Sequence, residues 1–336
     1  MNNIIDIKPL LFGVQKPKVV ITTHHKPDAD ALGSSLGLWH YLKLKGLDPV
    51  VVAPTDYGSF LTWMPGEKEV INYEADTDKS IRLVSDADFI FCLDFNALKR
   101  INSMGELVKA SKATKVMIDH HLDPDDFATF YLHDTNASST CELIYDAIKI
   151  WGDEALVSKD IASCLYAGIM TDTASFKHRS TYPSTHLVAA ALLEKGAESN
   201  VIFENIYDNY SIDRMRFIGY CLNEKLVILP EYNTALMFIT TEELKKYNSI
   251  TGDTEGLVNY GLAIKGINFS ILVVDRSVAR KMSFRSKGEF PANEFARKYF
   301  NGGGHFNAAG GESTDPMEVV EQKINEGLKE YKHLLG

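Results

Sequence analysis

Three side chains that could bind a metal ion lie within seven residues of one another: His24, Asp28 and Asp30. They follow a β-branched run, 19–23, that predicts a buried strand, and a helical pattern begins directly after them. They therefore lie on the loop at the carboxyl end of a strand, which is where open α/β sheets bind ligands. One imidazole and two carboxylates suit a hard or borderline divalent ion. The simpler interpretation is that Asp28 and Asp30 only cap the following helix.

Residues of the same types follow three other apolar runs: Asp94 after 89–93, Asp119, His120 and His121 after 115–118, and Asp172 after 160–169. The first two runs predict short buried strands, as does 49–53, and the third predicts a helix. Further helical patterns cover 138–150 and 184–195. Strands that alternate with helices predict a parallel, doubly wound sheet. Three separate strands would then present His or Asp at their carboxyl ends.

A second α/β region begins near residue 226. Its strand candidates are 226–229, 234–240, 268–274 and 281–285, and its helix candidates are 241–247, 291–300 and 316–335. Between Arg276 and Lys298 the chain has seven Lys or Arg residues against two Glu residues, which favours an anionic ligand as much as a solvated surface. The glycines 302–304 and His305 follow directly. Because glycine lets backbone N–H groups approach a ligand closely, this segment favours a phosphate pocket.

Composition narrows the class of protein. The 336 residues predict two domains, and their 45% hydrophobic and 24% charged content is typical of a globular protein. A net charge of −10 argues against tight, non-specific binding of long duplex nucleic acid, although bound metal ions would still allow a small anionic substrate. No apolar stretch approaches the roughly 20 residues that span a membrane, and no signal peptide is expected. Four scattered cysteines without a Cys-x-x-Cys pair favour a reducing cytoplasm.

Taken together, the motifs resemble those of a known family. Asp119-His120-His121, with His24-x-x-Pro-Asp28-x-Asp30, resembles the DHH phosphoesterase superfamily, and Asp94 and Asp172 occupy its two other motif positions. The segment 302–310, preceded by 283–286, looks like the associated DHHA1 domain. The resemblance covers nearly the whole chain. Ala29 and Ala174 stand where the family commonly has glycine, which changes no ligand.

The resemblance implies a fold and an organisation. The fold is α/β: a DHH catalytic domain with a parallel, doubly wound sheet over 1–195, and a smaller α/β DHHA1 substrate-binding domain over 226–336. A helical connector, 196–225, would join them, and substrate would lie in a cleft between the domains. The subgroup it looks most like degrades very short RNA (nanoRNA) and removes the 3′-phosphate of 3′-phosphoadenosine 5′-phosphate (pAp).

The resemblance also implies a role for each site residue. One divalent ion would be held by His24, Asp28 and Asp94, and a second by Asp30, Asp94, His120 and Asp172, with Asp94 bridging. Mn²⁺ suits these ligands, with Mg²⁺ or Co²⁺ as alternatives. His121 would contact the scissile phosphate and Asp119 would orient a neighbouring histidine. The substrate-binding residues would be Arg285, Gly302, Gly303, Gly304, His305 and Asn307.

These roles predict a hydrolase that uses two metal ions to activate water against short single-stranded RNA or pAp. The main alternative is a phosphodiesterase for cyclic di-AMP or its linear product pApA. A pyrophosphatase and an exonuclease for longer strands share the same metal ligands. A nucleotide-binding protein without turnover is the alternative from a different class, and the complete ligand set argues against it. A homodimer is compatible with the sequence.

Overall fold

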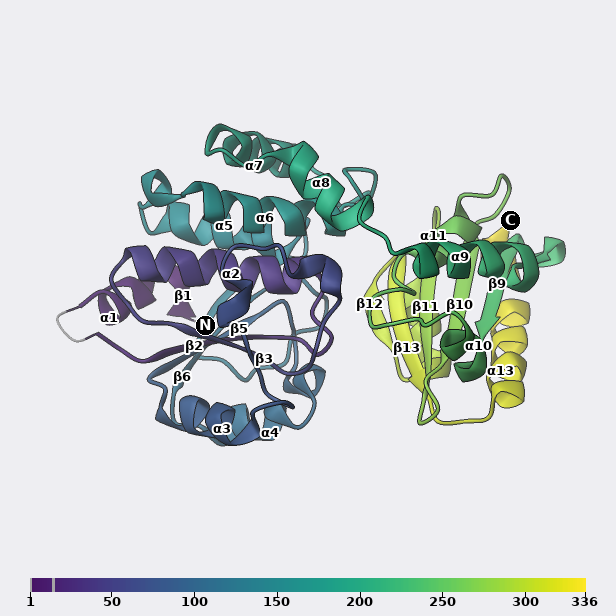
Figure 1. Ribbon diagram of the computed structural model, residues 1–336, viewed down its shortest axis with the longest axis horizontal. Helices are drawn as coiled ribbons and strands as arrows, with labels where there is room; N and C mark the ends of the chain where they lie inside the picture. The colour runs from purple at the N-terminus through teal and green to yellow at the C-terminus, as the bar shows by residue number, and fades with distance from the viewer. Residues whose placement is uncertain (1, 14–15) are drawn as a thin grey trace. The chain divides into compact units, whose positions relative to one another are not determined.

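The computed structural model of the protein describes residues 2–13 and 16–336, which divide into two compact units, 1–209 and 210–336. The division falls inside the segment that the sequence predicts to be a helical connector. One helix of that segment, α8 (Ser199–Tyr207), belongs to the first unit, and the next, α9 (Ile212–Tyr220), belongs to the second. Figure 1 shows both units, each of which is described by itself.

The first unit is built on a sheet that has seven strands in the described residues, all parallel, in the order β1-β7-β6-β5-β2-β3-β4. The strands are β1 (Asn2–Asn3), β2 (Val19–Thr23), β3 (Val50–Ala53), β4 (Ile71–Asn72), β5 (Phe89–Leu93), β6 (Thr114–Asp119) and β7 (Phe130–His133). In the centre, Thr23 pairs with Leu93, and Leu93 pairs with Ile118. The carboxyl ends of β2, β5 and β6 therefore lie side by side.

Helices cover both faces of this sheet, as the alternating pattern predicts (Figure 1). The α-helices are α1 (Lys8–Leu11), α2 (Ala29–Leu44), α3 (Thr77–Asp86), α4 (Met104–Ala110), α5 (Thr140–Ile150), α6 (Lys159–Asp172), α7 (Pro183–Glu194) and α8; short 3₁₀ turns cover Ile4–Ile7, Ser59–Leu61, Glu67–Glu69, Leu98–Ile101 and Glu154–Leu156. Ile21 faces the core formed with α2, α5 and α6, whereas Val20 faces the core formed with α3 and α4. The sheet is therefore doubly wound, and the prediction of this fold is confirmed.

The second unit has a mixed sheet of six strands in the described residues, in the order β12-β13-β11-β10-β9-β8. The strands are β8 (Val227–Leu229), β9 (Thr234–Ile239), β10 (Phe269–Asp275), β11 (Arg280–Ser286), β12 (Gly303–His305) and β13 (Ala308–Ser313). Helices α9, α10 (Thr241–Lys246), α11 (Leu257–Leu262), α12 (Ala292–Phe300), α13 (Met317–Glu330) and α14 (Lys332–Leu335) complete it, with turns at Cys221–Lys225 and Pro230–Tyr232. Phe284 packs with α12 and α13 on one face, and Leu272 packs with α9 and α11 on the other.

Three local features differ from the sequence prediction. The amphipathic helix α3 lies in a stretch for which the sequence analysis named no element. The helix expected over 316–335 is interrupted after Glu330. The glycine segment, for which the sequence analysis named no strand, forms β12 and pairs with β13. Within the described residues, no helix combines the length and the apolar character needed to cross a membrane.

Candidate active site

The loop after β2 carries the first three candidate ligands. Asp28 is the N-cap of α2: its Oδ1 accepts hydrogen bonds from the backbone N–H groups of Asp30 and Ala31, both at 3.0 Å. Its other oxygen, Oδ2, lies 3.8 Å from Nε2 of His24. Asp28 therefore caps the helix and still presents one oxygen to the site. Asp30, in the first turn of the same helix, is fully buried.

Asp94 lies at the centre of the cluster, directly after β5. It adopts a left-handed backbone conformation (φ 62°), which aspartate tolerates better than most residues, and its N–H donates to the carbonyl of Ile118. Oδ2 of Asp94 lies 3.3 Å from Nε2 of His24, and Oδ1 lies 3.5 Å from Nε2 of His120. One carboxylate thus stands between two imidazoles that come from different strands.

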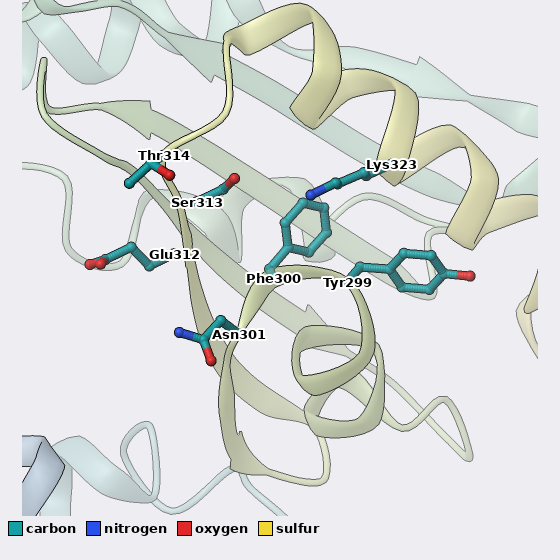
Figure 2. Close-up of a pocket in the computed structure, with 7 residues that line it drawn as sticks. All are labelled: Tyr299, Phe300, Asn301, Glu312, Ser313, Thr314 and Lys323. Carbon is teal, nitrogen blue, oxygen red and sulfur yellow. The ribbon is translucent and has the colours of Figure 1, made fainter.

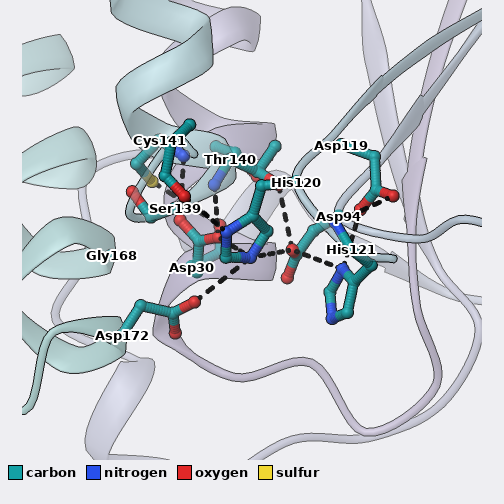
Figure 3. A network of polar contacts seen from close by, with 12 residues as sticks. Asp30, Asp94, Asp119, His120, His121, Ser139, Thr140, Cys141, Gly168 and Asp172 are labelled. Carbon is teal, nitrogen blue, oxygen red and sulfur yellow. Dashed lines mark hydrogen bonds and ion pairs between the residues drawn. The ribbon is translucent and has the colours of Figure 1, made fainter. Parts of the chain in front are cut away.

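Nε2 of His120 also lies 3.4 Å from Oδ2 of Asp172 and 3.8 Å from Oδ2 of Asp30. Asp172 is the last residue of α6, so four elements contribute to this cluster (Figure 3). Among the six predicted metal ligands, ligand atoms lie within 4.8 Å of one another in His24, Asp28 and Asp94, and again in Asp30, His120 and Asp172. The structure therefore brings together all six side chains that the sequence analysis assigned to metal binding.

Both histidines are fixed with the same ring atom toward the carboxylates. Nδ1 of His24 lies 2.9 Å from the carbonyl oxygen of His25, and Nδ1 of His120 lies 3.2 Å from that of Ala137. A carbonyl only accepts, so each Nδ1 carries a proton, and Nε2 is the ring atom that faces the carboxylates. A histidine that donates one N–H to a carbonyl and turns its other nitrogen toward carboxylates has the arrangement usual for a metal ligand.

The charges of the cluster are out of balance without a cation. Burial, together with the neighbouring carboxylates, raises the pKa of Asp172 to about 6 and raises the pKa of Asp30 well above its usual value. Burial opposes protonation of His120, yet its contacts with Asp172, Asp30 and Asp94 outweigh burial and raise its pKa to about 10. A bound cation would replace these protons and stabilise the ionised form of the carboxylates.

The environment of His121 differs from that of the candidate metal ligands His24 and His120. Its Nδ1 lies 2.8 Å from Oδ1 of Asp119, and its backbone N–H donates to Oδ2 of the same residue. Burial and the positive charge of Arg100 lower the pKa of His121, although Asp119 and Asp94 oppose this. His121 is therefore largely neutral near pH 7, and Asp119 fixes the orientation of its ring.

In the second unit, Arg285 and His305 lie in one row across the sheet. Arg285 of β11 pairs with Ala308 of β13, and Ala308 pairs with His305 of β12. Residues directly opposite one another on antiparallel strands point to the same face, so the small Ala308 separates two long polar side chains. The guanidinium of Arg285 donates to the carbonyls of Phe284 and Ala309.

The glycines beside this row meet different constraints. A side chain at Gly302 would place its Cβ 2.1 Å from the carbonyl oxygen of Gly310, and Gly304 has a φ of 133° that favours glycine. A Cβ at Gly303 would meet no atom within 4 Å. Gly302 and Gly304 are therefore explained by the hairpin itself, whereas Gly303 faces open space.

The chain matches two known domain families. Residues 18–169 match the DHH family, N-terminal domain, and residues 236–336 match the DHHA1 domain. The chain belongs to the DHH/DHHA1 phosphoesterases. The prediction of a phosphoesterase of this family, and hence of a hydrolase that acts on phosphate esters, is confirmed.

Named relatives support the same family. The bifunctional oligoribonuclease and PAP phosphatase NrnA of Bacillus subtilis is 29% identical, over 94% of this chain and 96% of its own length. A crystal structure of an exopolyphosphatase-related protein from Bacteroides fragilis is 41% identical, with a TM-score of 0.92 over 99% of this chain and 97% of that one. The fold is also similar to that of exonuclease RecJ bound to manganese, at 13% identity, a TM-score of 0.51, and 99% and 95% coverage of the two chains.

The DHH unit contains further polar groups at the site that the sequence analysis did not assign to it. Thr140 donates a hydrogen bond to Asp94, and the buried Glu142 accepts from Ser138 and Thr185. The only sequence signal was the Ser-x-x-Glu pattern of Ser139 and Glu142, which indicates a helix N-terminus. Ser139 does cap α5, but Glu142 binds Ser138 instead of closing the usual capping box.

The DHHA1 unit shows two departures from expectation. The side-chain amide of Asn307 donates to Oγ of Ser286 and to the carbonyl of Gly288, so it holds the β12–β13 turn against the end of β11. A cavity of about 260 Å³ lies next to Asn301, between the end of α12, the end of β13 and α13 (Figure 2). None of the residues that line this cavity is a predicted substrate ligand.

Proposed function

We propose that this protein is a divalent-metal-dependent phosphoesterase that hydrolyses short oligoribonucleotides to mononucleotides and pAp to AMP. The observation that carries the proposal is the largely buried cluster in which His24 and His120 turn Nε2 toward four carboxylates, those of Asp28, Asp30, Asp94 and Asp172. The substrate class is taken from the oligoribonuclease and PAP phosphatase that is similar over nearly the whole chain.

The donor set fits the metal ions that the family implies. His24, Asp28 and Asp94 would hold one ion, and Asp30, Asp94, His120 and Asp172 would hold the other. Mixed imidazole and carboxylate ligands suit Mn²⁺, and Mg²⁺ or Co²⁺ would also fit. The similar fold of RecJ bound to manganese is consistent with this choice. When bound, such ions polarise phosphate oxygens and lower the pKa of a water molecule.

The chain's own residues would then divide the remaining work. His121, held by Asp119, would turn Nε2 toward the scissile phosphate, whose negative charge would favour a proton on that atom. The hydrogen bond from Nε2 would then stabilise charge that develops on the phosphate. Asp119 would act through His121 by keeping Nδ1 protonated, which leaves Nε2 as the atom that meets the substrate. Four carboxylates without metal would repel a phosphate, so the metal-free protein is expected to bind these substrates poorly.

The DHHA1 unit would bind the part of the substrate that does not react. Arg285 and His305 offer charge-assisted hydrogen bonds from one face of the sheet, and β12, as an edge strand, offers backbone N–H groups beside them. Gly303, which has open space around it, is the glycine whose amide a phosphate could approach most closely. Asn307 would contribute by holding the turn that joins β12 to β13.

The direct test uses the full-length protein with Mn²⁺ and a substrate panel. We expect release of phosphate from pAp and of mononucleotides from labelled RNA of two to five nucleotides. Asp86→Asn is the control and should retain activity, because this exposed carboxylate pairs with Lys18 just before β2, at the opposite end of the strands from the cluster. If neither pAp nor short RNA is hydrolysed with Mn²⁺, Mg²⁺ or Co²⁺, the proposal is wrong.

The same panel separates the alternatives. Cyclic di-AMP, pApA, pyrophosphate and a long single strand are measured at the same Mn²⁺ concentration. Turnover of cyclic di-AMP or pApA at a higher kcat/KM than pAp and short RNA would replace the proposed substrate class. It would leave the family and the metal centre unchanged.

A further inference from the structure

One short segment, 137–141, contacts candidate metal ligands from three different elements (Figure 3). The carbonyl of Ala137 accepts from Nδ1 of His120 at 3.2 Å. The backbone N–H groups of Thr140 and Cys141 donate to Oδ2 and Oδ1 of Asp30 at 2.7 and 2.8 Å. The hydroxyl of Thr140 donates to Oδ1 of Asp94 at 2.9 Å. The start of α5 therefore fixes His120, Asp30 and Asp94 relative to one another.

Thr140 is the member of this segment that acts through its side chain. It is fully buried, and Asp94 is 2% exposed, so water does not compete for the bond between them. The bond selects Oδ1 of Asp94 for the side that faces His120 and leaves Oδ2 to face His24. A carboxylate without such a donor could rotate about its terminal torsion, because that torsion is only weakly restricted.

The segment is itself held by a buried carboxylate that the proposed chemistry does not use. Glu142 is 2% exposed, and its Oε2 accepts from the N–H of Ser138 at 3.0 Å, from the hydroxyl of Ser138 at 2.5 Å, and from the hydroxyl of Thr185 at 3.1 Å. Thr185 belongs to α7, so Glu142 ties the start of α5 to another helix. A buried carboxylate with three donors is satisfied and stabilises a single arrangement.

We infer that Thr140 is a positioning residue that sets the orientation of Asp94 between the two metal positions, and that Glu142 holds Thr140 in place. This inference rests on the proposed metal centre. Partners of metal ligands typically change metal affinity by about 10- to 100-fold when they are removed. Because Asp94 is expected to bridge, removal of its partner should weaken the binding of both ions rather than one.

The test compares Thr140→Val, which keeps the shape but removes the hydroxyl, with Thr140→Ser, which keeps the hydroxyl. The matched control is Thr234→Val, since Thr234 is another fully buried threonine with a hydroxyl bonded inside the protein, to the carbonyl of Tyr232 in the other unit. Mn²⁺ is titrated into each metal-free protein, and the free ion is measured by electron paramagnetic resonance without substrate. Thermal unfolding of the metal-free proteins is measured alongside.

We expect Thr140→Val to bind both Mn²⁺ ions about 10- to 100-fold more weakly, Thr140→Ser to bind close to wild type, and Thr234→Val to bind like wild type even if it is less stable. Wild-type affinity in Thr140→Val overturns the inference. If Thr140→Val does not fold, Thr185→Val, which removes one donor to Glu142, is measured in its place: weaker binding supports the inference and unchanged binding overturns it. Failure of the wild-type protein to bind Mn²⁺ would instead refute the proposed metal centre.

Discussion

In the DHH unit most of the candidate residues are buried side chains near the carboxyl ends of parallel strands, whereas in the DHHA1 unit they lie on β11, on β12 and in the turn before β13. Asp30, Asp94, Asp119 and His120 are at most 3% exposed. Arg285, Gly303, His305 and Asn307 are all half-buried. Buried charges need fixed partners, and here each has several. Half-exposed groups can adapt to a ligand, so the two units should respond differently to substitution.

This difference in burial predicts that substitutions in the two units change different kinetic constants. A residue that is fixed in place before substrate arrives contributes most in the transition state, so its loss should lower kcat. A residue that binds the part of the substrate that does not react contributes to the ground state as well, so its loss should raise KM with little change in kcat. Substitutions at Asp94 and Gly168 in one unit, and at Arg285 and Gly303 in the other, test this division.

The largest expected effect comes from Asp94→Asn. The amide keeps the size of the side chain but removes the charge that faces His24 and His120 and turns one acceptor into a donor. We expect kcat for pAp to fall by more than about 10³-fold, beyond the loss of a single transition-state donor. Steady-state kinetics with Mn²⁺ measures it. A variant that keeps wild-type kcat would refute Asp94 as a shared ligand.

Arg285→Ala is the counterpart in the DHHA1 unit. Hydrogen bonds to charged groups contribute about 1.5–3 kcal/mol, which corresponds to roughly a 10- to 100-fold rise in KM for pAp. kcat should stay near wild type. Arg280→Ala is the control and should alter neither constant, because Arg280 lies five residues away on the same strand and therefore on the opposite face of the sheet. A fall in kcat without a change in KM for Arg285→Ala would contradict the division between the units.

A pair of glycine substitutions tests how well each unit tolerates an added side chain near its candidate residues. An added Cβ at Gly168 of α6 would lie 2.3 Å from Sγ of Cys141 and 2.7 Å from Oδ1 of Asp30, whereas one at Gly303 would meet nothing within 4 Å. Gly168→Ala should lower the free energy of unfolding by about 1–3 kcal/mol, as expected for overpacking. Gly303→Ala should change it by less than about 0.5 kcal/mol. Denaturant unfolding measures both, and equal losses would show that the two segments are equally constrained.

How much the sequence could predict also differs between the units. The ends of β2 and β5 were predicted to the residue, because β-branched and apolar runs stop abruptly at polar residues there. Asp28 caps α2 and also presents an oxygen to the site. The two interpretations of this residue, as helix cap and as metal ligand, are therefore compatible. The glycine segment was harder to predict, since three glycines allow a loop as readily as the strand that β12 forms.

Contacts between distant segments could not be predicted from the pattern alone. Thr140 and Asp94 are 46 residues apart, and the sequence signals only that a helix begins near Ser139. Where that helix begins in space depends on the packing of α5 against α2 and α6. The three-residue run of positive φ at 174–176, which begins two residues after Asp172, could not be predicted either. The only sequence signal for it was Ala174, at a position where the family commonly has glycine.

The smallest expected effect concerns the other end of the helix that carries Asp28 and Asp30. Asp153 accepts hydrogen bonds from the Tyr41 hydroxyl at 2.7 Å and from Lys45 at 3.0 Å, which ties the end of α2 to the loop after α5. Burial opposes the ionisation of Asp153, but these two partners outweigh burial and lower its pKa. Asp153→Asn should therefore reduce the stability of the DHH unit by about 1 kcal/mol or less near neutral pH.

The effect of Asp153→Asn should depend on pH in a defined direction. Because the pKa of Asp153 is lower in the folded than in the unfolded protein, its ionised form stabilises the fold above the unfolded value of about 4, and this contribution disappears as the pH falls through the folded value. The difference in melting temperature between wild type and Asp153→Asn should thus be present at pH 7 and shrink toward pH 3. Thermal unfolding at several pH values measures it. A difference that stays the same down to pH 3 would mean that Asp153 holds α2 through contacts that do not depend on its charge.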